Sequence, residues 1–322
     1  MITRIGDIVI NARVYSEASI SSIRTHIEKN GSKYITYPKF IFLCGKGYDK
    51  EKLNTYKNSN RGIIQDFINK LLPDAKIVLS EQMWEEGFDE NIDLLTFEEF
   101  LAEVSDAIIL FVESPGSFCE LGAFAYANAL FSDKLVVVMD EQYRENQSFI
   151  STGPVLKAKK DGSKVVYAQI EDGALLASSE IRNVMLELAD RIKSKKSTIN
   201  KRIINDNHKQ VYISSFIIEI LEVLKIVQPI SRTDLLQIYK LIKNYESFTL
   251  VKRDGHEFNR EIKFGYILKL LQTANIIEEK LSIITLSDHN KLQSFMLKYS
   301  GYAMDRERNR IICKKYKYGE YV

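Results

Sequence analysis

The sequence is short of cysteine, of proline and of long apolar runs, and each shortage excludes a class of protein. Three cysteines lie far apart among 322 residues, so neither a disulfide framework nor a zinc site is expected. Five prolines and 15 glycines exclude a collagen-like or low-complexity chain. The longest purely apolar run, Ala107 to Val112, is far shorter than the roughly 18 residues that a membrane-spanning helix needs.

The amino-terminal residues carry charges through their apolar stretch, which is not the pattern of a secretory signal. We therefore expect a cytoplasmic protein that does not bind membranes. The hydrophobic content of 45% is that of a globular protein, and the length suggests roughly two domains. Four scattered histidines and the separate cysteines form no cluster with metal-ligand spacing, so no metal is expected.

The near-neutral net charge of +2 hides two unlike halves. Residues 1–200 hold 24 Lys and Arg against 29 Asp and Glu, a balance of −5, and the remainder holds 21 against 14, a balance of +7. A charged segment poor in large apolar residues begins at Lys193 and is the best candidate for a linker. We predict domains at 1–198 and 199–322. Residues 1–37 are an amino-terminal extension of the first domain, and their one amphipathic helix, marked by Ile20, Ile23 and Ile27, is expected to pack outside the sheet.

The first half alternates between apolar strands and amphipathic helices. This pattern predicts an α/β fold with a parallel, flavodoxin-like or Rossmann-like sheet covered by helices on both faces. The expected strands lie at about 40–44, 75–80, 107–112, 135–139 and, as an edge strand, 165–168; the expected helices lie at about 64–71, 97–104, 120–131 and 181–192.

The second half has a different pattern, with three amphipathic helices followed by two β-rich arms around a charged turn. These are the elements of a winged helix, a DNA-binding variant of the helix-turn-helix. The predicted phosphate-binding residues are Arg260, Lys263 and Lys269 near the third helix, and Lys280 at the turn. A solvated basic surface or a protein-docking module remains the alternative.

Ligands of open parallel sheets bind at the carboxyl ends of the strands. One such end is the loop Cys44-Gly45-Lys46-Gly47-Tyr48, whose glycines let backbone N–H groups approach a phosphate or sugar. We predict that Cys44, Gly45, Gly47 and Tyr48 bind substrate. A plain turn is the alternative, because Lys50 leaves the dinucleotide fingerprint G-x-G-x-x-G incomplete.

The second such end follows the strand 107–112 and leads to Glu120. Ser114, Gly116 and Ser117 are predicted to bind substrate, and Gly116 and Gly122 to allow close approach of ligand and strand. A carboxylate at position 120 could attack or stabilise a sugar C1 as a base leaves, because that transition state resembles an oxocarbenium ion. The alternative is a capping box, in which Ser117 begins the helix and Glu120 reaches back to it.

The segment Asp106-AIILFVESPGSFCELGAFA resembles the active-site segment of the nucleoside 2-deoxyribosyltransferase family. It resembles more closely the members of that family that serve as effectors of bacterial retrons, in which a winged-helix domain follows the sheet domain. The resemblance implies that Glu120 is the catalytic nucleophile and that Glu98 assists proton transfer; a solvated helix position is the alternative for Glu98. Two departures, Leu43 in place of an aromatic residue and Ser114 in place of an aspartate, put simple deoxynucleoside exchange in doubt.

The resemblance also implies a substrate and partners. NAD, as substrate rather than cofactor, or a related nucleotide would lose its base by N-glycosidic cleavage. A partner reverse transcriptase and its branched RNA–DNA, the msDNA, would hold the enzyme inactive until phage infection, with the chain an oligomer within that complex. The rival functions are nucleotide sensing without catalysis, DNA-binding regulation, and deoxyribosyl transfer between bases.

Overall fold

The chain folds into two compact units. The sheet unit comprises residues 38–195, and the helical unit comprises residues 1–37 together with residues 196–322. The computed structural model describes residues 7–10, 13–29, 38–47, 53–84, 93–126, 131, 133–170, 174–194, 204–205, 208–252, 254–258, 261–287 and 300–318.

The sheet unit is built on five parallel strands in the order β4-β3-β5-β6-β7. Its strands are β3 (Phe40–Cys44), β4 (Lys76–Val78), β5 (Ala107–Val112), β6 (Leu135–Asp140) and β7 (Lys164–Ala168). Its helices are α2 (Leu53–Asn58), α3 (Asn60–Leu71), α4 (Ser80–Trp84), α5 (Leu94–Val104), α6 (Pro115–Tyr126), α7 (Leu156–Lys160) and α8 (Ser179–Ser194). Three single turns are η2 (Glu141–Tyr143), the π-helical η3 (Ser151–Val155) and η4 (Leu175–Ala177).

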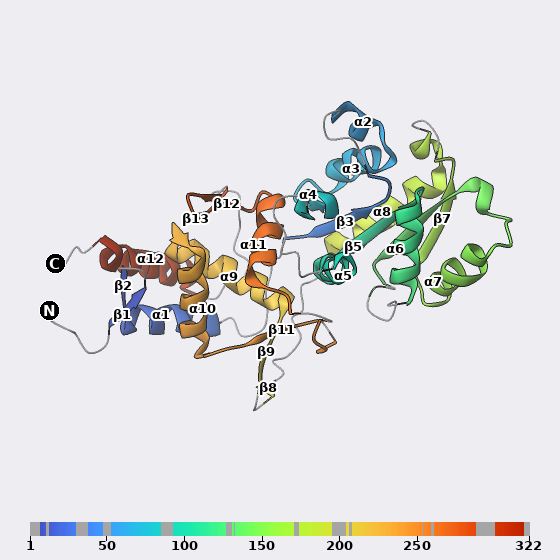
Figure 1. Cartoon of the computed structure of the whole chain (residues 1–322). Coiled ribbons are helices and arrows are strands. Elements are labelled where there is room, and N and C mark those ends of the chain that lie inside the picture. Colours follow the sequence, from blue (N-terminus) through green and yellow to red (C-terminus); the bar gives the residue numbers. More distant parts are fainter. Residues whose placement is uncertain are drawn as a thin grey trace. The chain divides into compact units, whose positions relative to one another are not determined.

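Helices cover both faces of this sheet (Figure 1), because the central strands are apolar on both sides. Side chains at alternate positions, such as Ile41 and Ile109, form one core with α3 and α8. On the other face α5 contacts β3 and α6 contacts β5, and the Phe42 ring meets Phe124 edge-on. The predicted α/β class, the parallel sheet and its edge strand are confirmed.

The helical unit contains the elements α9, β10, α10, α11, β12 and β13, with the further strand β11 between α10 and α11. Strand β13 pairs with β12 on one side and with the short β10 on the other, in a three-stranded antiparallel sheet. The bounds of this group are α9 (Ile213–Val227), β10 (Ile230–Ser231), α10 (Arg232–Lys243), α11 (Phe264–Thr273), β12 (Ile277–Lys280) and β13 (Ile283–Leu286). The other elements are β1 (Asp7–Ile10), β2 (Arg13–Ser16), α1 (Glu17–Glu28), β8 (Ile204–Asn205), β9 (His208–Tyr212), β11 (Thr249–Val251) and α12 (Tyr302–Tyr318).

The amino-terminal helix α1 differs from its prediction, because it packs on α9, α10 and α12 rather than outside the sheet. Figure 1 shows α1 beside α12, the first and last helices of the chain. Its apolar stripe, Ile20, Ile23 and Ile27, is buried, and Arg24 donates two hydrogen bonds of 2.8 Å to main-chain carbonyls at the end of α10. These interactions explain why the first 37 residues belong to the helical unit.

This division sharpens the charge contrast. Residues 38–195 hold 18 Lys and Arg against 26 Asp and Glu, a balance of −8, whereas the helical unit holds 27 against 17, a balance of +10. Within the described ranges no helix is both long and apolar enough to cross a membrane.

Candidate functional site

Both predicted loops lie at the switch point of the sheet. The strand order places the first and third strands of the sheet, β3 and β5, side by side, with the second strand outside β3. In such sheets the crevice for ligands opens at the carboxyl ends of these two neighbouring strands. The main-chain N–H of Lys46, after β3, donates a 3.2 Å hydrogen bond to Oε1 of Glu113, after β5, so the two loops meet.

Two acidic side chains meet at this edge. Glu120 on α6 and Glu98 on α5 are joined by a side-chain hydrogen bond. Glu98 is only 4% exposed, so the alternative of a solvated helix position for Glu98 is wrong. Glu120 is half-buried, and its Oε2 has no hydrogen-bond partner among the residues that the structure describes.

The two carboxyl groups share a raised affinity for protons. Burial is the main cause that raises the pKa of Glu98 to about 8, and the charge of Glu120 and the hydrogen bond between them add to it. Burial also raises the pKa of Glu120 to about 7, but the hydrogen bond from Glu98 and the charge of Arg61 favour its ionised form. Both carboxyl groups therefore bind a proton more readily than an ordinary glutamate, and the pair exchanges protons close to neutral pH, with Glu98 the more readily protonated of the two.

The start of α6 decides between the two interpretations of Glu120. The helix begins at Pro115, where the Ser117 N–H donates to Oγ of Ser114 and the Ser114 N–H donates to Oγ of Ser117, at 3.3 and 2.9 Å. The reciprocal cap therefore joins Ser114 and Ser117, one turn before the expected position. Because this cap does not involve Glu120, the capping-box alternative for Glu120 is wrong, and its carboxylate is available at the sheet edge.

Three residues absent from the prediction surround the pair. Arg61 on α3 is 1% exposed, and its Nη2 donates 2.6 Å hydrogen bonds to the Lys46 carbonyl and to Oε1 of Glu81 on α4. The side chain of Ser80 is hydrogen-bonded to Glu98 and favours its ionised form. The positive charge of Arg61 thus lowers the pKa of Glu120 and favours its ionised form.

The topology contains the information that would have identified these residues. Every helix that follows a parallel strand begins near the carboxyl edge, so first-turn residues of α3 and α4 belong beside the ligand. Gly62 is a further indication, because a Cβ there would lie 2.0 Å from the Tyr56 carbonyl. This close approach of α2 and α3 requires glycine and holds the first turn of α3, with Arg61, in place.

The loop after β3 is held by short contacts. Gly45 has a φ of +151°, and a Cβ there would lie 3.1 Å from both the Glu113 carboxylate and the Phe111 Cβ, so this position requires glycine. Nδ2 of Asn60 donates to Oε2 of Glu113 at 2.7 Å and fixes the same carboxylate. Among the described residues no heavy atom would lie within 4 Å of a Cβ at Gly47, and Tyr48 lies outside the described residues.

Cys44 ends β3 beside the acid pair. Burial raises the pKa of its thiol well above the usual value, and the charges of Glu120 and Glu98 raise it further. The thiol is therefore protonated and cannot act as a thiolate nucleophile. The substrate-binding roles of Cys44, Gly45, Gly47, Ser114, Gly116 and Ser117 stay predictions.

The predicted phosphate-binding lysines lie around α11 in the helical unit. Lys263 precedes α11 and is exposed, and Lys269 is half-buried on that helix. Lys280, exposed at the end of β12, forms a 2.8 Å ion pair with Glu278. Arg260 lies outside the described residues. In the part of the chain that the structure describes, no group of three or more His, Cys, Asp or Glu residues could hold a metal ion.

The fold and the site together define a class: an α/β protein with a proton-sharing glutamate pair at the switch point of its sheet, continued by a basic helical unit. A family model for the STM3845 retron effector protein matches residues 57–279, more than two thirds of the chain. The chain therefore belongs to the STM3845 retron effector family.

Two curated relatives come from Escherichia coli. The Retron Ec86 putative ribosyltransferase/DNA-binding protein is 38% identical over 129 residues, which cover 39% of this chain and 39% of that protein. The Retron Ec73 putative ribosyltransferase/DNA-binding protein is 35% identical over 136 residues, which cover 40% and 41%. The chain thus matches about two fifths of the length of these relatives.

Proposed function

We propose that the sheet unit cleaves the N-glycosidic bond of NAD or a related nucleotide, with Glu120 as nucleophile and Glu98 as its proton partner. The observation that carries the proposal is the hydrogen-bonded Glu98–Glu120 pair, whose pKa values are raised to about 8 and about 7. Carboxyl pairs with separated protonation states suit glycosidic chemistry, in which one group must be ionised and the other must carry a proton. The relatives named putative ribosyltransferases support the same class of reaction.

In the first step the Glu120 carboxylate attacks C1′ while the C1′–N bond breaks and its electron pair stays on the nitrogen. Nicotinamide leaves NAD without a proton, because the electron pair neutralises its positive ring. A purine or pyrimidine base needs a proton to leave, and Glu98 is placed to donate it. The sugar is then esterified to Glu120.

In the second step a water molecule attacks C1′, the ester bond breaks and Glu120 becomes a carboxylate again. Esterification removes the charge of Glu120, one of the causes that raise the pKa of Glu98. Glu98 then ionises and accepts the proton of the attacking water. Cleavage of NAD by water therefore yields ADP-ribose, nicotinamide and one released proton.

The basic helical unit would bind nucleic acid in this proposal. Its three helices, short strand β10 and β-hairpin support a winged-helix interpretation, and its balance of +10 favours polyanions. Both curated relatives are named DNA-binding proteins. We propose that a retron reverse transcriptase with its msDNA is bound here and holds the glycosidase inactive, and that loss of this complex during phage infection activates it.

Incubation of the purified chain with NAD tests the catalytic part. Free nicotinamide and ADP-ribose are expected in equal amounts from the wild type, and at least ~10³-fold more slowly from Glu120→Gln. Glu98→Gln is expected to cleave NAD faster than it cleaves a purine nucleoside, because only the nucleoside needs the proton of Glu98. Absence of turnover with NAD, nucleotides and nucleosides would favour a sensor, and a swapped base in the presence of two bases would favour transfer.

A further inference from the structure

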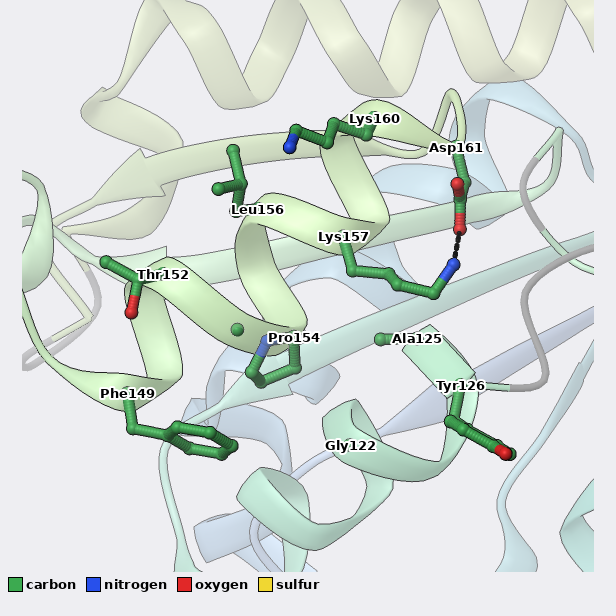
Figure 2. Close-up of a pocket in the computed structure, with 11 residues that line it drawn as sticks. Gly122, Ala125, Tyr126, Phe149, Thr152, Pro154, Leu156, Lys157, Lys160 and Asp161 are labelled. Atoms are coloured by element: carbon green, nitrogen blue, oxygen red, sulfur yellow. Dashed lines mark hydrogen bonds and ion pairs between the residues drawn. The ribbon is translucent and has the colours of Figure 1, made fainter.

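A pocket of about 570 Å³ lies in the sheet unit between the last turns of α6 and the segment that runs through η3 and α7 (Figure 2). Neither Glu98 nor Glu120 lines it, so it is separate from the site described above. Its volume is that of pockets that bind small organic ligands. Its floor consists largely of residues with small side chains, Gly122 and Ala125 on α6 and Gly153 and Pro154 on η3.

Gly122 keeps this space open. A glycine inside a helix costs roughly 1 kcal/mol relative to alanine, so helix propensity does not favour glycine at position 122. A Cβ at Gly122 would have no heavy atom within 4 Å among the described residues, unlike one at Gly62, so packing within the described chain does not require this glycine. The prediction that Gly122 allows the neighbouring strand to come close is therefore wrong, because the position faces open space.

The rim combines aromatic rings with positive charge. Tyr126 and Phe149 are 91% and 84% exposed, although rings of this size are usually buried. Figure 2 shows them on opposite sides of Pro154. Lys157 on α7 is paired with Asp161 at 2.5 Å, whereas exposed Lys160 has no ion pair or hydrogen bond within the described part of the chain.

The charge of this rim contrasts with its surroundings. Residues 156–160 include three lysines, within a unit whose overall balance is −8. Exposed aromatic faces bind planar bases by stacking, and lysines bind phosphate. An acidic peptide would use the lysines but not the rings, and an uncharged apolar ligand would leave the lysines unused. A nucleotide uses both.

We propose that this pocket is a second nucleotide-binding site, in which a base lies against Tyr126 and Phe149 over the glycine floor and its phosphate meets Lys160. The nucleotide is either free in solution or one residue of a single strand. The proposal does not depend on catalysis at Glu120. Because Gly122 follows Glu120 by two positions on α6, the same helix carries both sites.

Photolabelling of the full chain with 8-azido-ADP, followed by mass mapping of the labelled peptides, tests the proposal. We expect label on peptides that contain Tyr126 or Phe149, in the wild type and equally in Glu120→Gln. Gly122→Met should reduce this labelling at least tenfold by filling the floor, and Lys160→Glu at least threefold. The matched control is Lys70→Glu, the same charge change on exposed Lys70 of α3, which should leave labelling unchanged.

Folding is checked in the same variants. Gly122→Met is expected to keep or raise the melting temperature, since methionine has the higher helix propensity, so lost labelling would not reflect unfolding. Competition distinguishes the two sources: ADP displaces the label if the ligand is free, and a ten-residue oligothymidylate displaces it at lower concentration if the ligand is a strand. Labelling confined to the loops around Glu120, or unaffected by Gly122→Met, would overturn the proposal.

Discussion

Buried carboxylates in the two units have opposite protonation behaviour. In the sheet unit Glu98 and Glu120 face each other, and their pKa values are raised to about 8 and about 7. In the helical unit Glu222 is fully buried, yet its pKa is lowered, although burial alone would raise it. Its Oε1 accepts hydrogen bonds from Nε2 of His26 at 2.9 Å and from the Tyr302 hydroxyl at 2.5 Å, and these bonds favour the ionised form.

The difference separates a candidate for catalysis from a structural contact. Glu222 joins α9 to α1 and α12, and Glu219 is similarly held by Lys243 at 2.8 Å and by the Tyr239 hydroxyl. Carboxylates that are hydrogen-bonded or ion-paired in this way hold helices together. In the sheet unit, by contrast, Glu98 lies beside a second carboxylate, Glu120, whose charge raises the pKa of Glu98, and Arg61 lowers only the pKa of Glu120. Paired groups whose protonation is held near neutral pH are typical of active sites.

The largest expected effect is on toxicity. Under the proposed function, expression of the wild-type chain without a reverse transcriptase and msDNA should arrest growth and deplete NAD. Glu120→Gln should lose at least ~10³-fold of the activity, about 4 kcal/mol of transition-state stabilisation. Growth and cellular NAD are the measurements. Glu103→Gln, another buried glutamate of α5, is the matched control for substitution in this region. Persistence of both toxicity and NAD loss in Glu120→Gln would show that this carboxylate is not the nucleophile.

The next effect is on stability. Glu222→Ala should reduce the free energy of unfolding by about 3–5 kcal/mol, because it leaves the buried side chains of His26 and Tyr302 without the carboxylate to which they are hydrogen-bonded. Urea unfolding followed by circular dichroism measures the change. Glu278→Ala, at the exposed end of the hairpin, should cost less than about 0.5 kcal/mol. Equal losses in the free energy of unfolding for the two substitutions would show that Glu222 does not stabilise the helical unit.

The pH dependence of stability should differ in sign between the units. A carboxyl with a raised pKa stabilises the folded state below its unfolded pKa, and this contribution is lost as the pH rises through its folded value. Glutamine has no charge at any pH, so Glu98→Gln avoids this loss. The free energy of unfolding of the sheet unit should therefore be about 1–3 kcal/mol higher than in the wild type at pH 9, and little changed at pH 5. Fluorescence of Trp84, the single tryptophan of the chain, reports on this unit. A variant less stable than the wild type at pH 9 would contradict the raised pKa.

The smallest effect concerns nucleic acid. Lys263→Ala should weaken binding of the chain to an oligonucleotide about threefold, and reduce the slope of log K against log salt by about 0.9 if one phosphate contact is lost. Lys280→Ala should change the slope by less than the full value of about 0.9, because Lys280 is already paired with Glu278. Fluorescence anisotropy at several salt concentrations measures both. A salt slope unchanged by both substitutions would place the phosphate contacts elsewhere.

The five strands of the sheet, and the place of Glu120 on the helix that follows β5, followed from the sequence, because apolar strands and the turn Ser114-Pro115-Gly116 are local patterns. Arg61 and Glu81 did not follow, although their 2.6 Å ion pair supports the site. They come from separate helices that only the tertiary fold brings together. A sequence pattern gives no distance between residues so far apart.

The boundary of the first unit and the cap of α6 show the same limit. The stripe Ile20, Ile23 and Ile27 correctly indicated an amphipathic helix, but an apolar stripe does not specify which surface it covers. The spacing Ser117-x-x-Glu120 fitted a capping box, but the hydrogen bonds of the structure place the reciprocal cap between Ser114 and Ser117. In both cases the sequence pattern identified a local feature but did not specify which residues it contacts.

Carboxyl titration by ¹³C NMR tests the shared proton most directly. With glutamate labelled at its side-chain carboxyl, spectra of the wild type, Glu98→Gln and Glu120→Gln assign the two signals by difference. We predict wild-type pKa values of about 8 for Glu98 and about 7 for Glu120, and a lower pKa of Glu98 in Glu120→Gln, which lacks the charge that raises it. Two signals that titrate independently near the ordinary glutamate value of about 4.3 would contradict the account.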